Sequence, residues 1–279
     1  MNSMAKSESS SRIVTSVVAV ISAAALAVSL IAAGFAACAV PDVSTKALAS
    51  VYSTDGASPF TKDELVAAAV QTKHYTIDDN DKAAAYATIA AINAQEALAG
   101  TAGKGAPKID ATANYAAGEL SGEQVAALEA AFDAASERYV LTPDAVSHLD
   151  DVFDVVQAAK WWLLAAVVAA CVGCTATAFR GGKRLLGRVL AGAGVSVLAV
   201  FALLAAWVAI DFDGFFAQFH SLFFAAGTWT FSWDSLLICM YPPEFWVGMG
   251  VIWLVVTVAC CVVCITIGRL LRKGSTQKR

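Results

Sequence analysis

Four long stretches of the sequence contain no Asp, Glu, Lys or Arg, and they constrain the fold more than any other feature. They are residues 13–41, 161–179, 189–210 and 245–268. Each has about 20 residues or more, and about 20 helical residues cross a hydrocarbon core of about 30 Å. A helix also satisfies its own backbone hydrogen bonds in lipid. With 58% apolar residues, 15% charged residues and a mean hydropathy of +0.63, a soluble single-core protein is excluded. We therefore expect an all-α integral membrane protein with four transmembrane helices.

The charged residues indicate how these helices are oriented. Of the 19 Lys and Arg residues, 4 lie in 180–188 and 5 in 269–279, whereas 211–244 contains none. The positive-inside rule therefore predicts that both termini are cytoplasmic. The first outer loop contains 18 Asp and Glu against 7 Lys and Arg. Such an acidic loop predicts no nucleic-acid partner.

The expected layout alternates cytoplasmic, membrane-spanning and extracytoplasmic segments. It comprises a cytoplasmic N-terminus (1–12), a first span (13–40), a mostly helical extracytoplasmic cap loop (41–159), a second span (160–179), a basic cytoplasmic connector (180–188), a third span (189–210), an aromatic extracytoplasmic loop (211–244), a fourth span (245–268) and a cytoplasmic tail (269–279).

The first apolar stretch has a second interpretation, as a secretory or lipoprotein signal cleaved before Cys38. Its apolar run of about 26 residues exceeds the 7–15 residues of a typical signal core, so we expect an uncleaved span. A mature chain starting at Cys38 would contradict this topology. Cys171 and Cys174 have the spacing of zinc ligands, but within an apolar span they are expected to be packing residues.

Helix signals recur along the cap loop. Thr61 with Glu64 and Ser121 with Gln124 are capping boxes, and the Ala-rich segment 81–98 is followed by Gly100. Large apolar residues are sparse here, so we expect short, Ala-packed helices that lie on one another or on the membrane domain.

The last helix of the cap carries the first candidate for chemistry. Thr142 as N-cap and Pro143 as the first helical residue predict a helix that continues into the second span. His148 and Asp151, three residues apart, lie on one face of it. His148 is expected roughly 10 Å above the apolar boundary.

The second candidate lies in the aromatic loop, where nine aromatic residues fall between positions 212 and 233 without a Lys or Arg. Such a segment is expected at the membrane interface. His220 lies within it, and a plain interfacial anchor explains the pattern as well as a site does. Histidine suits proton transfer near neutral pH, and an aromatic environment lowers its pKa and keeps it neutral. The third histidine, His74, is expected on the surface of the cap.

Three motifs resemble those of the bacterial lipoprotein intramolecular transacylases, which are four-span membrane enzymes with an extracytoplasmic cap. They are HLDDV at 148–152, FHSLFFAAGTWTF at 219–231 and DSLLICMYPPEFW at 234–246. The resemblance implies transfer of the sn-2 acyl chain of a lipoprotein's diacylglyceryl group to the α-amino group of its N-terminal cysteine, giving a lyso-form lipoprotein. It also implies a location in the bacterial plasma membrane, with the active site on the extracytoplasmic face.

For that reaction we assign His148 as general base, with Asp151 fixing its tautomer. His220 protonates the leaving oxygen or stabilises the oxyanion, and the two histidines could exchange roles. Asp150 is a weaker candidate. The expected substrate-binding residues are Phe219, Phe223, Phe224, Trp229, Phe231 and Asp234. We expect no cofactor, no metal and no obligate protein partner; the partners are a diacylated lipoprotein and membrane lipid.

The sequence bears on three other functions. Transport is disfavoured because no Asp, Glu, Lys, Arg or His interrupts the four apolar stretches. A non-catalytic membrane binding or assembly protein would use the acidic cap as its recognition surface and would tolerate loss of either histidine. A metal site of His148, Asp151 and His220 has suitable ligand types, but only three of them in two distant loops.

Overall fold

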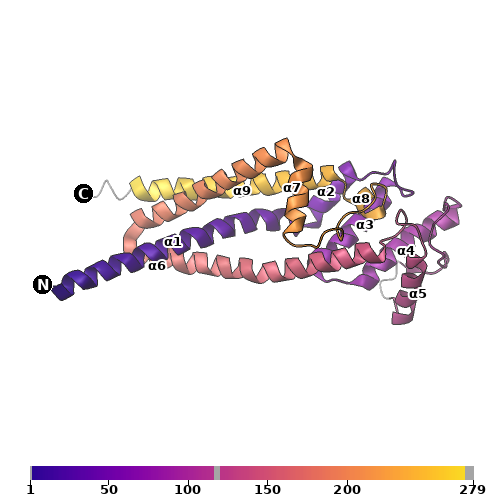
Figure 1. Ribbon diagram of the computed structural model, residues 1–279, viewed down its shortest axis with the longest axis horizontal. Helices are drawn as coiled ribbons and strands as arrows, with labels where there is room; N and C mark the ends of the chain where they lie inside the picture. The colour runs from indigo at the N-terminus through magenta and orange to yellow at the C-terminus, as the bar shows by residue number, and fades with distance from the viewer. Residues whose placement is uncertain (1, 116–119, 274–279) are drawn as a thin grey trace. The chain divides into compact units, whose positions relative to one another are not determined.

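The computed structural model describes residues 2–115 and 120–273, and within them all regular structure is helical (Figure 1). The elements are α1 (Asn2–Ala39), α2 (Asp42–Tyr52), α3 (Lys62–Lys73), a π-helical turn (His74–Asp78), α4 (Lys82–Ala99), α5 (Gly122–Asp133), α6 (Pro143–Ile210), α7 (Phe212–Ser221), α8 (Leu236–Met240) and α9 (Pro243–Lys273). The chain forms two compact units. One consists of Met1–Ala37, Ala158–Phe215 and Ile252–Arg279, and the other of Cys38–Gln157 and Phe216–Val251.

The first unit contains the apolar helices. Among the described residues, Ser11–Ala39, α6 and α9 are long and apolar enough to cross a membrane. The 68 residues of α6 are interrupted at Gly182, whose φ of 69° lies in the left-handed region. Figure 1 shows α6 turning back on itself, so that its two parts within this unit run in opposite directions. The second and third apolar stretches are therefore both in α6.

The helices of this unit pack closely where small residues let their backbones approach. A Cβ added to Gly194 of α6 would lie 2.8 Å from Cγ1 of Ile265 in α9, so the two backbones are close there. Trp253 of α9 packs edge-on against Phe35 of α1 and Phe201 of α6, with ring centroids 5.6 and 5.7 Å apart. Helices in lipid associate through contacts of this kind because apolar burial gives little driving force there.

The core of the second unit contains buried Ala residues of the cap helices, as expected, but also large side chains. Its fully buried residues include Leu65, Tyr75, Ile89, Phe132, Leu141, Leu236, Met240 and Phe245. Three of these come from the segment 236–245, which follows the aromatic loop. Segment 236–245 therefore adds large side chains to a core to which the cap loop contributes few.

Hydrogen bonds fix segment 236–245 in that core. The Ser53 hydroxyl donates to the carbonyl of Met240 at 3.1 Å, and the Thr54 N–H donates to the carbonyl of Cys239 at 2.9 Å. The Tyr241 hydroxyl donates to the carbonyl of Ala69 in α3. These three hydrogen bonds therefore pair buried polar groups that are far apart in the chain, as a stable core requires.

The predicted helix starts of the cap are confirmed. Both capping boxes are formed, at Thr61 before α3 and at Ser121 before α5. Asp81 caps α4, which ends at Gly100 with a φ of 73°. The Thr142 hydroxyl accepts from the N–H of Ala145 at 3.3 Å, and α6 continues without another break to Gly182.

Three α-helices were not predicted, one of them the short α8, where the Ser235 hydroxyl accepts from the N–H of Ile238. Helix α2 follows Pro41 and has no side-chain cap. Helix α7 lies in the aromatic loop, and the Asp211 carboxylate accepts from the N–H of Gly214 at 2.8 Å in its first turn. An Asp before an apolar segment is an N-cap signal, so α7 could have been found from the sequence.

Candidate functional site

His148 lies in the second turn of α6 and is buried, with 8% of its surface exposed. Its ring packs edge-on against Phe224 with centroids 4.9 Å apart, and lies 5.8 Å from the ring of Phe231. Both phenylalanines follow α7 in the aromatic loop, so a residue of the cap and residues of that loop form one site within the second unit.

His220 is half-buried near the end of α7. Its ring centroid is 4.0 Å from that of Phe216 and 4.8 Å from that of Trp229. Its Nδ1 lies 2.8 Å from the carbonyl oxygen of Phe216. A carbonyl oxygen only accepts, so this contact assigns the hydrogen to Nδ1 and leaves a lone pair on Nε2 of the neutral ring.

The two imidazole rings lie 6.3 Å apart between centroids. We call the group of His148, His220, Phe216, Phe224, Trp229 and Phe231 the histidine cluster. Burial lowers the pKa of His148 to about 4, the nearby His220 adds to this, and Asp151 partly opposes it. Burial also lowers the pKa of His220, against the opposing effect of the hydrogen bond to Phe216. Both rings are therefore neutral at pH 7.

Asp151, the residue predicted to fix the tautomer of His148, does not contact its ring through a hydrogen bond. Its side chain is exposed, and its influence on His148 is electrostatic. Within the described residues, four buried side-chain atoms have no hydrogen-bond partner. Two of them, Nδ1 of His148 and Nε1 of Trp229, lie in this site, whereas Oδ1 of Asn93 and Oγ1 of Thr257 lie elsewhere. A buried polar atom without a partner is costly, which is typical of a group kept for a ligand.

The other predicted residues divide into two groups. Phe219 lies 5.7 Å from His220 between ring centroids, and Phe223 packs on Phe219 at 5.3 Å, with 44% of Phe219 and 49% of Phe223 exposed. Asp234 instead forms an ion pair with Nε of Arg138 at 3.4 Å. The structure thus places the aromatic candidates around the histidines and gives Asp234 a partner in the cap.

Asp150, the weaker candidate, also has partners of its own. Its carboxylate accepts from the hydroxyl of Tyr75 and, at 3.2 Å, from the side-chain amide of Asn80. These bonds tie the start of α6 to the π-helical turn that follows α3. Asp150 therefore holds the helix that carries His148.

Phe216 is the site residue that the sequence reasoning missed. It precedes His220 by one helical turn, and it contributes both its ring and its carbonyl oxygen. The i, i+4 spacing brings the two residues together once the segment is a helix. Because α7 was not predicted, this signal went unused.

A polar cavity of about 760 Å³ adjoins the histidine cluster at Phe231. It is lined mostly by hydroxyl and carboxylate side chains, from Ser136, Glu137, Thr142, Asp144, Ser147, Thr228, Thr230 and Ser232, together with Gly227 and Phe231. Some of these residues precede α6 in the chain, and others lie in its first two turns. It therefore offers hydrogen-bonding groups next to the apolar rings around His148.

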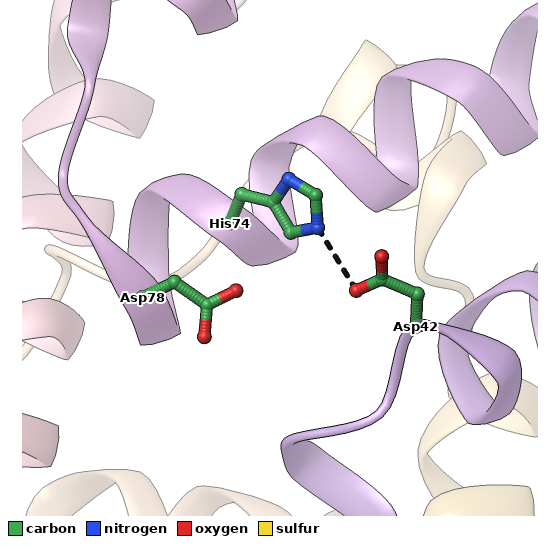
Figure 2. Close-up of side chains that lie close together, drawn as sticks. All are labelled: Asp42, His74 and Asp78. Atoms are coloured by element: carbon green, nitrogen blue, oxygen red, sulfur yellow. Dashed lines mark hydrogen bonds and ion pairs between the residues drawn. The ribbon is translucent and has the colours of Figure 1, made fainter.

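His74 belongs to a separate cluster with Asp42 and Asp78, shown in Figure 2. Its Nε2 lies 2.9 Å from the Asp42 carboxylate, and one possible ligand atom from each of the three residues lies within 4.8 Å of the others. Among the described residues this is the group with metal-binding geometry; the set His148, Asp151 and His220 does not have it.

A lysine side chain already pairs with both carboxylates of that cluster. Nζ of Lys73 lies 3.1 Å from Asp42 and 2.8 Å from Asp78, and only 7% of its side chain is exposed. Hydrogen bonds from His74 and Lys73 lower the pKa of Asp42. Burial alone would lower the pKa of Lys73, but its bonds to Asp78 and Asp42 outweigh this and raise it. The cluster is therefore an ion-pair network of the cap, with an ammonium group where a metal would need room.

The fold and the site define a helical membrane-integral protein with a pair of neutral histidines enclosed by aromatic rings. The family model described as lipoprotein intramolecular transacylase Lit matches residues 115–246. This match confirms the resemblance predicted from the three motifs, and it covers both histidines and the aromatic loop.

Solved structures agree on the fold. The membrane-integral lipoprotein intramolecular transacylase Lit from Bacillus cereus is 14% identical, with a TM-score of 0.62 over 95% of this chain and 98% of that one. A variant of it with a histidine-to-alanine mutation is 15% identical, with a TM-score of 0.64 over 99% of this chain and 100% of that one. No curated protein matches the chain.

Proposed function

We propose that this protein is an intramolecular acyltransferase acting on diacylated lipoproteins. It moves the sn-2 acyl chain of the diacylglyceryl group to the α-amino group of the N-terminal cysteine. The observation that carries this proposal is the pair of neutral histidines, 6.3 Å apart between ring centroids, within the segment that matches the family. The reaction needs a base for the amine and a donor for the developing oxyanion, and two neutral imidazoles can supply both.

The hydrogen bonds favour His220 as the general base and His148 as the oxyanion donor, the reverse of the first assignment made from the sequence. Nε2 of His220 has the free lone pair, because Nδ1 is bonded to the carbonyl of Phe216. We therefore assign His220 as the base that accepts the proton of the attacking amine. His148, whose pKa is lowered to about 4, remains a neutral N–H donor that stabilises the oxyanion without releasing its proton.

In this mechanism the proton lost by the amine is the proton gained by the leaving oxygen. The amine nitrogen attacks the ester carbonyl, and its proton passes to Nε2 of His220. Collapse of the tetrahedral intermediate forms the amide C–N bond and breaks the ester C–O bond, and the proton on His220 passes to the leaving glyceryl oxygen. Holding amine and ester within one molecule supplies much of the rate, because both reactants arrive together. No nucleophilic side chain is needed.

Trp229 is the second group that we assign to the oxyanion. Its Nε1–H is a buried donor without a partner, and its ring lies against His220. An oxyanion stabilised in a water-poor environment requires such preorganised donors.

The surroundings of the histidine cluster suit the two parts of the substrate. The exposed rings of Phe219 and Phe223 provide an apolar surface for acyl chains. The polar cavity beside Phe231 provides hydroxyls and the carboxylates of Glu137 and Asp144 for the polypeptide that follows the lipidated cysteine. Asp151 acts on His148 through its charge. Asp234 acts through its ion pair with Arg138.

For the topology we propose four membrane spans with both termini in the cytoplasm of the bacterial cell. The break at Gly182 lies inside the basic connector 180–188, where a chain that crosses twice has to reverse. The positive-inside rule then places that connector in the cytoplasm and the histidine cluster on the extracytoplasmic side of the plasma membrane.

The experiment is expression in a host whose lipoproteins are diacylated, followed by mass spectrometry of their N-termini. We expect an isomer of unchanged mass whose fragment ions place one acyl chain on the amine. Unaltered lipoproteins despite good expression of the folded protein would instead support a non-catalytic membrane binding or assembly protein.

A further inference from the structure

A second cavity, in the membrane unit, is lined only by cationic side chains. It has a volume of about 690 Å³ and is lined by Arg184, Arg188, Arg269, Arg272 and Lys273. Two of these residues lie in α6 beyond Gly182, and three lie at the end of α9. Neither the transacylase motifs nor the histidine cluster includes any of them.

A contact between two glycines brings these side chains together. A Cβ added to Gly187 would lie 2.5 Å from the carbonyl oxygen of Gly268, and one added to Gly268 would lie 2.6 Å from that of Gly187. The backbones of α6 and α9 therefore touch at this point. Arg188 and Arg269 directly follow the two glycines, so the helix contact fixes the place where both side chains start.

The positive-inside rule explains why these residues are cationic, but it does not explain why their side chains meet at one cavity. Arg180 and Lys183 lie in the same connector and do not line the cavity. Like charges that meet at one cavity repel one another, and a bound anion would offset the repulsion among Arg184, Arg188 and Arg269. The cavity is therefore arranged for a negatively charged ligand.

We propose that this cavity binds the phosphate headgroup of an anionic membrane phospholipid. Arginine binds phosphate oxygens through two parallel N–H donors, and basic pockets between membrane helices take such headgroups. A lipid is favoured over free phosphate because an apolar surface adjoins the cations. Leu270 of α9 is 64% exposed and Ile267 is 45% exposed, as side chains that face acyl chains are. The proposal depends on the membrane unit and is independent of the transacylase assignment.

The test compares two double variants that remove the same charge. R188Q/R269Q removes two cavity residues, whereas R180Q/K183Q removes two cations that do not line the cavity. Each purified protein is titrated with phosphatidylglycerol in phosphatidylcholine nanodiscs, and bound lipid is measured by native mass spectrometry. We expect R188Q/R269Q to bind phosphatidylglycerol at least about tenfold more weakly, and R180Q/K183Q to bind it like the wild type.

Two results would overturn the proposal. Equal losses in both double variants would mean that only the overall charge of this end of the protein matters. Displacement of phosphatidylglycerol by millimolar inorganic phosphate, with tight binding of phosphate alone, would assign the cavity to a free anion. If R188Q/R269Q loses helical content by circular dichroism, the single variants R269Q and R180Q are compared in the same way. Transacylase activity, measured in parallel, distinguishes a failure of this proposal from a failure of the proposed function.

Discussion

The rings of His148 and His220 lie 6.3 Å apart, and one comes from α6 and the other from α7. Burial lowers the pKa of both, so the pair is neutral where the substrate amine, with a pKa of about 7.7 to 8.0, begins to lose its proton. The carbonyl of Phe216 distinguishes them, because it fixes the tautomer of His220 alone.

His220→Gln removes the proposed base while keeping a polar side chain of similar length. We expect the rate of acyl transfer to fall by about 10²- to 10⁴-fold, the usual contribution of a general base. The measurement is the initial rate on a diacylated lipopeptide in nanodiscs, followed by fragment-ion mass spectrometry. His74→Gln is the matched control, because His74 lies in the ion-pair network with Asp42. A His220→Gln rate close to that of the control would remove His220 from the mechanism.

Trp229→Phe deletes the indole N–H and keeps an aromatic ring against His220. Loss of one oxyanion donor lowers kcat by about 10²-fold or more, and we expect that loss with little change in KM. The control is Trp233→Phe, since Trp233 is 74% exposed. An increase in KM with an unchanged kcat would show that Trp229 only binds substrate.

The buried His148 makes stability depend on pH. Its folded pKa of about 4 lies below the unfolded value of about 6.5, so the folded state favours the neutral ring. Its contribution is complete above pH 6.5 and is lost as the pH falls toward 4, by about 3 kcal/mol in all. Thermal unfolding in detergent between pH 7.5 and 4 measures the effect. Acid should destabilise the wild type more than His148→Gln; parallel curves would mean that His148 is not buried as a neutral ring.

Lys73→Met leaves the carboxylates of Asp42 and Asp78 side by side without their common cation. We expect a loss of about 1 to 2 kcal/mol in unfolding free energy, since the lysine is buried while the carboxylates are partly exposed. Lys82→Met, which breaks an exposed pair with Glu129, should cost little. Activity below the unfolding temperature should survive both changes.

The same cluster gives a prediction about metal. We expect EDTA to leave the melting temperature of the wild type unchanged, because the Lys73 ammonium already pairs with both carboxylates. Stoichiometric zinc in the purified protein, together with a lower melting temperature after chelation, would contradict the ion-pair interpretation.

Local signals in the sequence predicted the helix ends well. The capping residues Thr61, Asp81, Ser121 and Thr142 act within one helical turn of themselves, so their effect can be read from neighbouring positions. Helix α2 has no such cap and was missed. Helix α7 had one in Asp211, which went unused among so many apolar neighbours.

The sequence by itself determined the apolar helices, the acidic cap and the two histidines as candidates, because hydropathy, charge and capping depend on nearby residues. The tertiary structure decided which groups meet. It brought His148 to His220 and Phe224, paired Asp234 with Arg138, and placed Lys73 between Asp42 and Asp78. These contacts join residues that are far apart in the chain, and their distances are set by the packing of a shared core rather than by any local pattern.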